Sequence, residues 1–511
     1  MKRREFIHYG MGTIAAVAYS QTPSTTQLRV RQSALKLQAN DPLFGKYAEA
    51  VKRMHALPAT DKRNWLNQAK IHADHCPHGT AGFLPWHRQY ILYFEKICGE
   101  LIGDPQFALP YWDWTEKSGI IPDAFFDVPE LNVTHWNDPG TYESEGWGPV
   151  DSISIRALAK GVGVQNDPLR GGVFSTPAIN SILNETAFER FYRRLEGSPH
   201  NGGHVAVGFP PTGKPGHMGS GLSPLDPLFW LHHCNVDRLW AQWQMARNRT
   251  PSFNLTYDGN FADAQGNPVN VTADGSVDFV SLGYTYDFLG IPNVLASAAG
   301  LIPHSAPGAG SPFALMAPGA PSNQPTVIGT GTSDAPVTIA LEKKVTITVS
   351  GLKEELTKNR TVLDSTLPPL QEATRLAQFE KSMVAGFGKE QKLPRRILAK
   401  IKGVEASAFQ QDPVINVFVN CPYLSPTTPY TDPHYAGTFS LFGAAKAAGG
   451  QNHDHAHNEP TDYYVDITNA VRGLDQDKLD KLDIQFMTLT GNVNEPGPGS
   501  FTFGAVEILS T

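Results

Sequence analysis

His72-Ala-Asp-His-Cys-Pro-His-Gly-Thr-Ala-Gly-Phe-Leu-Pro-Trp-His87 is the first of two histidine-rich stretches that decide how this chain folds. The second begins as His200-Asn-Gly-Gly-His204 and continues, after a short interval, as Asp226-Pro-Leu-Phe-Trp-Leu-His-His233. Imidazole is a preferred ligand of copper, zinc, iron and nickel. Because carboxylates are almost absent from both stretches, they predict a pair of metal ions held by neutral nitrogen donors.

The spacing of the histidines predicts the elements that carry them. His200 and His204 are four residues apart, so on a helix they lie one turn apart on the same face and can bind one ion together. His78 and His87 are nine residues apart, which would place them on opposite sides of a single helix. Because proline favours the first turn of a helix, we expect a helix that begins near Pro85 and carries His87, with His78 in the preceding loop.

Asp226 and Pro227 form a second helix-start signal, an N-cap residue followed by proline. The helix that they open carries His232 and His233. Adjacent residues on a helix point about 100° apart, so only one of these two histidines is expected to bind the metal. Elsewhere we expect mostly helix in residues 40–115, long loops in 116–180, and a further helix in 181–196.

Four motifs in this order resemble the copper-A and copper-B signatures of tyrosinases and catechol oxidases, which are type 3 dicopper proteins. They are Phe83-Leu-Pro-Trp-His-Arg88, Leu109-Pro-Tyr-Trp-Asp-Trp114, His200-Asn-Gly-Gly-His204 and Asp226-Pro-Leu-Phe-Trp-Leu-His-His-Cys-Asn-Val-Asp-Arg238. The resemblance covers roughly residues 40 to 250 and rests on several independent motifs. It implies a mainly α catalytic domain, a four-helix bundle that holds a dicopper centre.

The resemblance also implies two copper ions with histidine ligands, and O2 as the co-substrate. One ion would be bound by His72, His78 and His87, and the other by His200, His204 and His233. His75 competes with His72 for the first position, because both lie near Cys76. We favour His72, since residues 68–74 are expected to be helical and the plant enzymes place this ligand four residues before a cysteine.

Cys76 lies two residues before His78, where fungal and several bacterial tyrosinases carry a thioether bond from the sulfur to the imidazole carbon. The resemblance therefore implies such a bond, which would fix the His78 ring before copper arrives. The alternative is a free, buried thiol. Cys98 and Cys234 lie within helical patterns and are expected in the core, so no disulfide framework is required.

Two polar residues beside the second cluster correspond to the glutamate and asparagine that, in this family, hold a water next to the copper. They are Glu196 and Asn201, and such a water could take the proton of a phenol because both side chains accept hydrogen bonds. The alternative is that Glu196 ends a helix in solvent and that Asn201 caps a turn. Phe229 matches the aromatic residue that flanks the pocket, and His232 is expected in the pocket wall rather than as a ligand.

Length, charge and local composition divide the chain. Its 511 residues carry a net charge of -7 with no basic concentration that would indicate nucleic acid binding. After the N-terminus no stretch is apolar for long enough to span a bilayer. The expected segments are a twin-arginine-like signal peptide at 1–20, the catalytic domain at 21–297, a linker rich in Ala, Gly, Pro and Ser at 298–336, and a C-terminal β-sandwich at 337–511.

The sandwich is predicted from a period-two alternation of side chains. Its expected strands cover residues 337–341, 344–350, 396–401, 413–420, 462–467, 482–489 and 501–509. This region is similar to the C-terminal domain of plant polyphenol oxidases, which implies a lid that presents a side chain to the copper site and keeps the enzyme latent. The loop at 421–430 could supply that side chain, and we expect residues 453–457, His-Asp-His-Ala-His, to be a polar loop rather than a copper-delivery patch.

The function predicted from these features is that of a tyrosinase, which hydroxylates monophenols ortho to the hydroxyl and oxidises o-diphenols to o-quinones. One alternative is a catechol oxidase or o-aminophenol oxidase without activity on monophenols. A second is a hemocyanin-like O2 carrier, against which the export signal and the single catalytic unit argue. The expected partners are small phenols and O2, a copper chaperone is a further candidate, and the signal predicts an exported protein, periplasmic or secreted.

Overall fold

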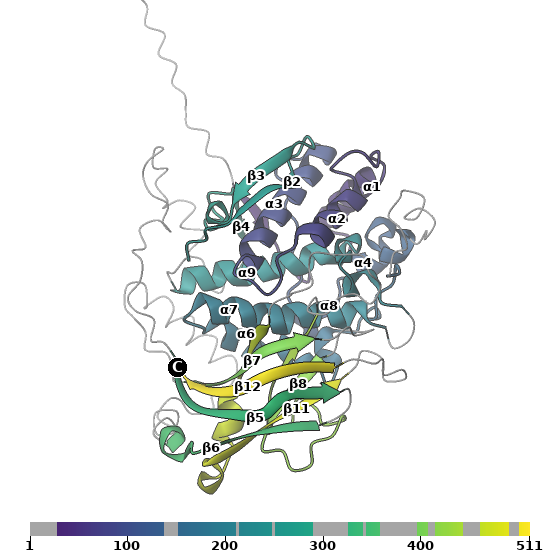
Figure 1. Ribbon diagram of the computed structural model, residues 1–511. Helices are drawn as coiled ribbons and strands as arrows, with labels where there is room; N and C mark the ends of the chain where they lie inside the picture. Colours follow the sequence, from purple (N-terminus) through teal and green to yellow (C-terminus); the bar gives the residue numbers. More distant parts are fainter. Residues whose placement is uncertain are drawn as a thin grey trace, which may run out of the picture.

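A computed structural model of the chain shows a helical part that lies against a part made of β-sheet (Figure 1). The structure describes residues 28–136, 152–210, 214–247, 251–289, 325–340, 344–357, 396–406, 414–442, 460–489 and 500–511. The signal-like segment 1–20 and the histidines between 453 and 457 lie outside the described residues.

The helical part holds the helices that the histidine motifs predict. They are α1 (Pro42–His55), α2 (Trp65–His75), α3 (Phe83–Ile102), α8 (Asn201–Gly208) and α9 (Leu228–Arg247). Helix α3 begins at Phe83 with Pro85 in its first turn, and the Asp226 side chain accepts a hydrogen bond of 2.9 Å from the Leu228 N–H at the start of α9. Both predicted helix starts are therefore confirmed.

The core of the helical part lies between α3 and α9. The rings of Phe94 on α3 and Trp230 on α9 stack with centroids 3.4 Å apart and an interplanar angle of 9°. Tyr90 and Trp65 are buried beside them, and Tyr90 lies 4.7 Å from Trp230. Burying large aromatic side chains is the main favourable term in such a core, and here it holds the two helices at a fixed separation.

The predicted single helix over residues 181–196 is wrong, because two helices occupy that region. They are α6 (Thr176–Leu183) and α7 (Phe188–Leu195). In the break between them, the Glu185 carboxylate is fully buried and binds Arg190 at 3.0 Å and Arg194 at 2.7 Å. A buried carboxylate needs such partners, and the break in the helix turns Glu185 toward both.

Short strands and single turns complete the helical part, and the described residues between 116 and 180 hold only short turns, in keeping with the predicted loops. β1 (Arg29–Arg31) pairs with β4 (Tyr284–Tyr286), and β2 (Thr256–Ala262) pairs with β3 (Pro268–Thr272). The short helical turns are η1 (Glu116–Gly119), α4 (Ala124–Asp127), η2 (Pro129–Leu131), η3 (Val133–Trp136), η4 (Val164–Asn166), η5 (Gly171–Phe174), η7 (His217–Gly219), η8 (Ser223–Leu225) and η9 (Asp274–Ser276).

The C-terminal part is a β-sandwich of two four-stranded antiparallel sheets, which confirms the predicted class. One sheet has the order β10 (Thr461–Asp466), β7 (Ile397–Ala406), β12 (Ser500–Ser510), β5 (Thr326–Ala340), and the other β6 (Lys344–Ser350), β11 (Lys481–Leu489), β8 (Val414–Val419), β9 (Tyr435–Ser440). Two short helices, α13 (Thr468–Arg472) and η10 (Gln476–Lys478), follow β10. Buried side chains such as Ile401, Val417 and Phe486 fill the space between the sheets.

The predicted end of the linker at residue 336 is wrong, because strand β5 already begins at Thr326. Its Gly329 and Gly331 pack so closely on β6 of the other sheet and the residues after it that a Cβ atom would lie 2.5 Å from Leu352 and 2.7 Å from Ile347. Glycine in a strand often marks such a close approach. The composition that suggests a flexible linker is here the composition of a closely packed strand.

The two parts meet along an interface with both apolar and polar contacts, in which β9 and β10 face α7 and α8. Arg396 at the start of β7 reaches into the helical part, where Nη2 lies 2.9 Å from a Glu185 carboxylate oxygen and Nη1 donates to the Ser181 carbonyl at 2.9 Å. The Ser181 hydroxyl in turn donates to Asp466 at 2.6 Å.

Among the described residues, no helix has the length and apolar character needed to cross a bilayer.

Candidate metal centre

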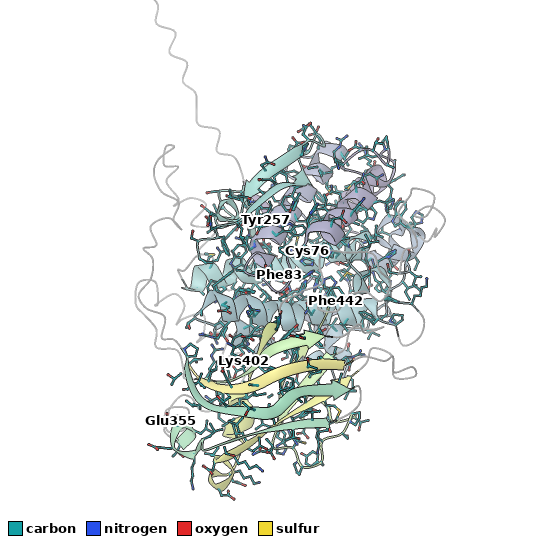
Figure 2. All side chains as sticks on the ribbon, viewed as in Figure 1. Cys76, Phe83, Tyr257, Glu355, Lys402 and Phe442 are labelled. Carbon is teal, nitrogen blue, oxygen red and sulfur yellow. The ribbon has the colours of Figure 1, made fainter. Side chains whose placement is uncertain are left out.

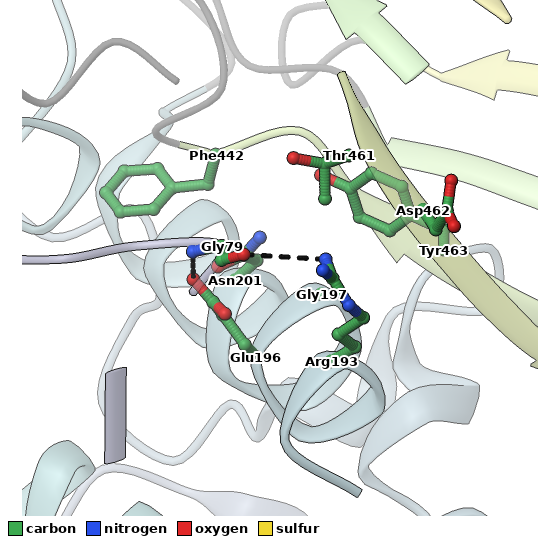
Figure 3. Close-up of a pocket in the computed structure, with 9 residues that line it drawn as sticks. All are labelled: Gly79, Arg193, Glu196, Gly197, Asn201, Phe442, Thr461, Asp462 and Tyr463. Carbon is green, nitrogen blue, oxygen red and sulfur yellow. Dashed lines mark hydrogen bonds between the residues drawn. The ribbon is translucent and has the colours of Figure 1, made fainter. Parts of the chain in front are cut away.

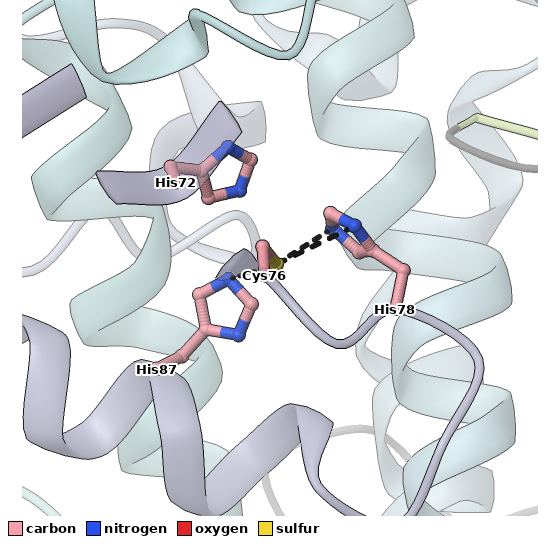
Figure 4. A group of neighbouring side chains, drawn as sticks. All are labelled: His72, Cys76, His78 and His87. Carbon is pink, nitrogen blue, oxygen red and sulfur yellow. Dashed lines mark hydrogen bonds between the residues drawn. The ribbon is translucent and has the colours of Figure 1, made fainter. Parts of the chain in front are cut away.

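The first histidine group is assembled from α2, the loop after it, and α3 (Figure 4). His72, Cys76, His78 and His87 are all buried, and each offers a ligand atom within 4.8 Å of the others. His72 is on the buried face of α2, whereas His75 is exposed to solvent. Helix α2 therefore turns His72, and not its competitor His75, toward the group.

Backbone carbonyl groups orient the rings of this group. Nδ1 of His72 lies 2.8 Å from the Gly221 carbonyl oxygen, and Nδ1 of His87 lies 2.8 Å from that of Phe83. A carbonyl only accepts, so each Nδ1 carries the proton and Nε2 keeps its lone pair for a metal. Burial lowers the pKa of His87 to about 3, which keeps the ring neutral.

The second group begins in a π-helical turn, η6 (Glu196–His200), that contains Pro199 and runs directly into α8. Such turns are rare and occur frequently at functional sites. The turn brings His200 one helical turn before His204, as the spacing predicts. Nδ1 of His204 lies 2.8 Å from the Met218 carbonyl oxygen, so its Nε2 is again the atom left for a metal.

Two ring nitrogens of the second group are in the state expected of metal ligands. Nε2 of His200 and Nε2 of His204 are buried and have no hydrogen-bond partner among the residues that the structure describes. Burial lowers the pKa of both rings, and that of His204 falls to about 3. Both rings are therefore neutral. A buried, neutral nitrogen without a partner costs free energy unless a ligand occupies it, and a metal ion is such a ligand.

His232 and His233 lie on different sides of α9. The His233 ring is parallel to that of His87, with centroids 4.2 Å apart, and its centroid lies 4.9 Å from that of His200. The His232 ring lies against Trp114 at 5.1 Å and fills the space beside Gly203, where a Cβ atom would be 2.3 Å from the ring. His233 thus faces both groups. His232 also belongs to the second group, because His200, His204, His232 and His233 each offer a ligand atom within 4.8 Å of the others, but its ring lies on the side away from the first group.

The two groups adjoin across the middle of the helical part. The ring centroids of His78 and His200 are 5.8 Å apart, and those of His72 and His233 are 6.3 Å apart. All of the donors are buried imidazoles, which suit copper in the two oxidation states of a redox site. The residues present therefore fit two neighbouring copper ions.

Cys76 lies at the edge of the His78 ring. Its sulfur is 3.4 Å from Nδ1 and 3.5 Å from Nε2, so it faces the ring carbon between the two nitrogens (Figure 4). It also lies 3.3 Å from Nε2 of His87. Burial raises the pKa of the Cys76 thiol. The approach supports the predicted thioether bond, which stays a prediction because all four cysteines are free here.

Glu196 and Asn201 lie beside the second group, as predicted. A carboxylate oxygen of Glu196 accepts a hydrogen bond of 2.5 Å from the Gly79 N–H, one residue after His78. Burial raises the pKa of Glu196 to about 8, which the hydrogen bond from Gly79 and the charge of Arg193 oppose. The side-chain oxygen of Asn201 bonds Nδ1 of His200 at 2.8 Å, and its amide donates to the Ser440 carbonyl at 3.0 Å.

Two phenylalanine rings border the histidines. Phe229 is buried on α9, and its ring centroid lies 4.2 Å from that of His233 and 5.1 Å from that of His72. It therefore lies where the sequence predicts a pocket residue. Phe442, just after β9, is parallel to His204 with centroids 4.4 Å apart and an interplanar angle of 7°. Figure 2 shows it among the side chains of the helical part, above the strands of its own domain.

The sequence did not single out Phe442. The loop at 421–430, proposed as the source of a covering side chain, lies elsewhere: Tyr423 is exposed and Tyr430 packs against Gly172. An aromatic residue that follows a strand is common, so nothing in the local pattern distinguishes Phe442. Only the contact between two distant parts of the chain reveals it.

Comparisons of sequence agree with this geometry. Residues 46–246 match the family model described as the common central domain of tyrosinase. Polyphenol oxidase C, chloroplastic, of Solanum lycopersicum is 30% identical over 319 residues, which cover 54% of this chain and 50% of that protein. The (+)-larreatricin hydroxylase, chloroplastic, of Larrea tridentata is 29% identical over 309 residues, 53% of this chain and 51% of that protein. The chain thus spans about half the length of the curated relatives it matches.

Comparisons of structure extend over both parts of the chain. A recombinantly expressed latent aurone synthase (polyphenol oxidase) superimposes with a TM-score of 0.60 at 20% identity, covering 96% of this chain and 90% of the other. Latent apple tyrosinase gives a TM-score of 0.58 at 18% identity, covering 96% and 98%. The shared fold therefore includes the C-terminal sandwich.

Proposed function

Because the chain belongs to the tyrosinase and polyphenol oxidase family of type 3 dicopper proteins, we propose that it is a tyrosinase. It would hydroxylate monophenols ortho to the hydroxyl and oxidise o-diphenols to o-quinones. A bound pair of copper ions supplies the redox chemistry with O2 that both reactions require. The observation that carries the proposal is the convergence of two buried groups of imidazoles, with Glu196 and Asn201 beside them.

We assign His72, His78 and His87 to one copper ion and His200, His204 and His233 to the other. The carbonyl acceptors at Nδ1 of three of these rings support the assignment, because they fix each tautomer before a metal binds. The position of His233 between the groups supports its choice over His232.

The protein's own residues would orient the phenol and take its proton. Phe229 offers a buried aromatic face against which a phenol ring can pack. The Gly79 N–H holds one carboxylate oxygen of Glu196, and we assign the other to accept the phenol proton, directly or through a water, when the group is ionised, which its pKa of about 8 favours at alkaline pH. Asn201 keeps one oxygen lone pair for the same hydrogen-bond network, since His200 uses the other.

We further propose that the C-terminal domain keeps the enzyme latent. Phe442 occupies the face of His204 that an incoming aromatic ring would need, and the Ser440 carbonyl binds the Asn201 amide. Both contacts come from the segment at the end of β9. Substrate could reach the centre only after this segment moves or is removed, for example by cleavage upstream of β5.

Copper analysis tests the ligand assignment directly. The full chain should bind two copper ions per molecule, and His204→Ala should bind one and lose oxidase activity. The matched control is His75→Ala, which removes an exposed histidine outside both groups and should still bind two. Two ions in His204→Ala, or one in His75→Ala, would contradict the assignment.

Substrate comparison tests the activity. Oxygen uptake with tyrosine and with catechol should both appear once the lid is displaced, with a lag before the tyrosine reaction. Glu196→Gln should slow the tyrosine reaction more than the catechol reaction, because only a monophenol has to be deprotonated and hydroxylated first. Oxidation of catechol alone would identify a catechol oxidase, and no oxidation of either would leave an O2 carrier.

A further inference from the structure

A small pocket of about 20 Å³ lies where the sandwich meets the helices, next to the second histidine group (Figure 3). The helical part contributes Arg193, Glu196 and Asn201 to its wall, and the C-terminal domain contributes Phe442, Asp462 and Tyr463. In the closed structure the pocket has room for little more than one water molecule, because side chains of the C-terminal domain occupy it. The pocket joins the residues of the proposed proton transfer to the outside, so a substrate would pass through it or lie in it.

Arg193 on α7 is the cationic residue of this pocket. Its Nε lies 3.2 Å from Glu189, whose side chain is 61% exposed, and its Nη1 lies 3.4 Å from the Gly79 carbonyl oxygen. Exposed ion pairs of this kind contribute little to stability. Arg193 can therefore exchange Glu189 for another carboxylate. The Arg193 side chain is only 19% exposed, and Figure 3 shows it directed toward the gap between the two walls.

The C-terminal domain fills this pocket with particular chemical groups. Phe442 puts an aromatic ring on His204, and the Tyr463 ring lies so close to Gly197 that a Cβ there would be 2.9 Å from it. Asp462 adds a carboxylate, which Lys400 of the same domain binds at 2.9 Å. The closed structure thus places an aromatic ring on the histidines, and among the described residues no carboxylate of the C-terminal domain forms an ion pair with the Arg193 guanidinium in the pocket wall.

We propose that Arg193 is a specificity-determining residue that binds the carboxylate of phenolic acids, phenols whose ring carries a short chain ending in a carboxylate. Such a substrate would put its ring where Phe442 lies and its carboxylate on the guanidinium. Arginine suits this role because its planar fork matches a carboxylate and stays charged. The inference deepens the proposed function and rests on it, since it names the class of phenol that the same site prefers.

A binding experiment tests the inference without turnover. The probes are 3-phenylpropanoate and its amide, neither of which is a phenol, titrated by NMR into full-length chain with Phe442→Ala. The acid should bind about tenfold more tightly than the amide, as expected for one charge-assisted hydrogen bond. Adding Arg193→Gln should remove this preference, Arg193→Lys should restore part of it, and added salt should weaken it.

Arg53→Gln is the matched control for the binding experiment, because Arg53 also pairs with an exposed glutamate four residues away, at 2.6 Å, and lies on α1 far from the pocket lining. It should leave the preference for the acid intact. If Phe442→Ala unfolds, Tyr463→Ala opens the mouth of the same pocket and takes its place. Equal affinity for acid and amide, no binding of either, or an unchanged preference in Arg193→Gln would overturn the inference.

A kinetic comparison separates this inference from the proposed function. The substrates are 3-(3,4-dihydroxyphenyl)propanoate and its methyl ester, and the quantity measured is the ratio of their kcat/KM values. Arg193→Gln should lower the acid-to-ester ratio about tenfold, and Arg53→Gln should not change it. Failure of the ester to react would reject the phenol oxidase, whereas a reactive ester with an unchanged ratio would reject only the role of Arg193.

Discussion

Arg88, the residue after His87, forms a buried ion pair with Asp237, one helical turn after His233, with Nε and Oδ1 2.5 Å apart. The Asp237 carboxylate also binds Arg31 at 3.0 Å and accepts hydrogen bonds from Tyr284 and Tyr286. Burial would raise the pKa of Asp237, but the charges of Arg88 and Arg31 outweigh it and lower the pKa. The two helices that carry the proposed ligands of different copper ions are therefore joined by an ion pair next to those residues.

Removing this charge should destabilise the protein and its metal centre. Asp237→Asn leaves two buried guanidinium groups without their shared carboxylate, and breaking a buried pair in this way costs about 3–5 kcal/mol. Denaturant unfolding should show the loss, and copper competition with a chelator should show weaker binding. Asp104→Asn, which removes an exposed pair with Lys46, is the control and should change neither measurement.

Phe442 should control the activity of the intact chain. Phe442→Ala removes the ring that covers His204, so the untreated full-length variant should oxidise catechol faster than the untreated wild type. Tyr423→Ala changes an exposed aromatic side chain of the same domain and should leave the rate unchanged. Equal rates in Phe442→Ala and wild type would show that this ring does not limit access.

Arg396 should govern how firmly the C-terminal domain is held. Burial alone would raise the pKa of Glu185, but Arg396, Arg194 and Arg190 lower it to about 2, so the carboxylate is charged at neutral pH. Arg396→Gln removes the partner that crosses the interface, and truncating one member of such a pair costs about 2–5 kcal/mol of association. Arg190 and Arg194 remain, so the helical part itself should stay folded.

Calorimetry and basal oxidation measure the effect of Arg396→Gln together. The sandwich should separate at a lower temperature, and catechol oxidation by untreated enzyme should rise. Lys402→Gln is the control, because Lys402 binds Glu507 within the sandwich at 2.9 Å and does not cross the interface. A single unfolding transition at the wild-type temperature in Arg396→Gln would contradict the role of this contact.

His217 should make stability depend on pH. Its ring lies between the hydroxyls of Ser152 at 2.8 Å and Ser154 at 3.0 Å, and burial lowers its pKa from 6.5 to about 4. Below about pH 6.5 the unfolded chain therefore takes up a proton that the folded chain refuses, so this contribution is complete above that pH and is lost toward pH 4. The total is about 3 kcal/mol.

Unfolding by denaturant at several pH values between 7 and 4 checks this linkage. Other buried histidines contribute to the same slope, so the quantity to compare is the difference between wild type and His217→Gln. That difference should shrink as the pH falls, because the variant has no group there to protonate. A constant difference across the range would show that His217 titrates normally in the folded protein.

Local signals in the sequence were sufficient to predict the elements that carry the proposed ligands. Pro85 and Asp226 begin the helices that carry His87 and the His232-His233 pair, and the family resemblance then favours His233. The buried side of α2 likewise selects His72 over His75. These inferences succeed because each depends on residues within a few positions of the ligand, where the geometry of a helix is nearly invariant.

Contacts between distant segments could not be predicted in the same way. The break at residues 184–187 exists because Glu185 needs buried partners, one of which, Arg396, comes from the other domain. Strand β5 begins early because Gly329 fits against Leu352. Phe442 meets His204 only after the sandwich has docked. In each case the deciding partner is far away in the chain, so no local pattern carries the information.

Strand β12 comes after every other strand of its sheet in the chain, yet it lies inside that sheet and pairs with both β5 and β7. Ribosomes add about 5–20 residues per second, so α9 is synthesised roughly 10–50 s before β12. Throughout that interval the sheet lacks the strand that joins its two halves, while the six proposed ligands have already been made. The order of translation thus gives the histidines a period in which the cell can supply metal before the covering domain is able to assemble.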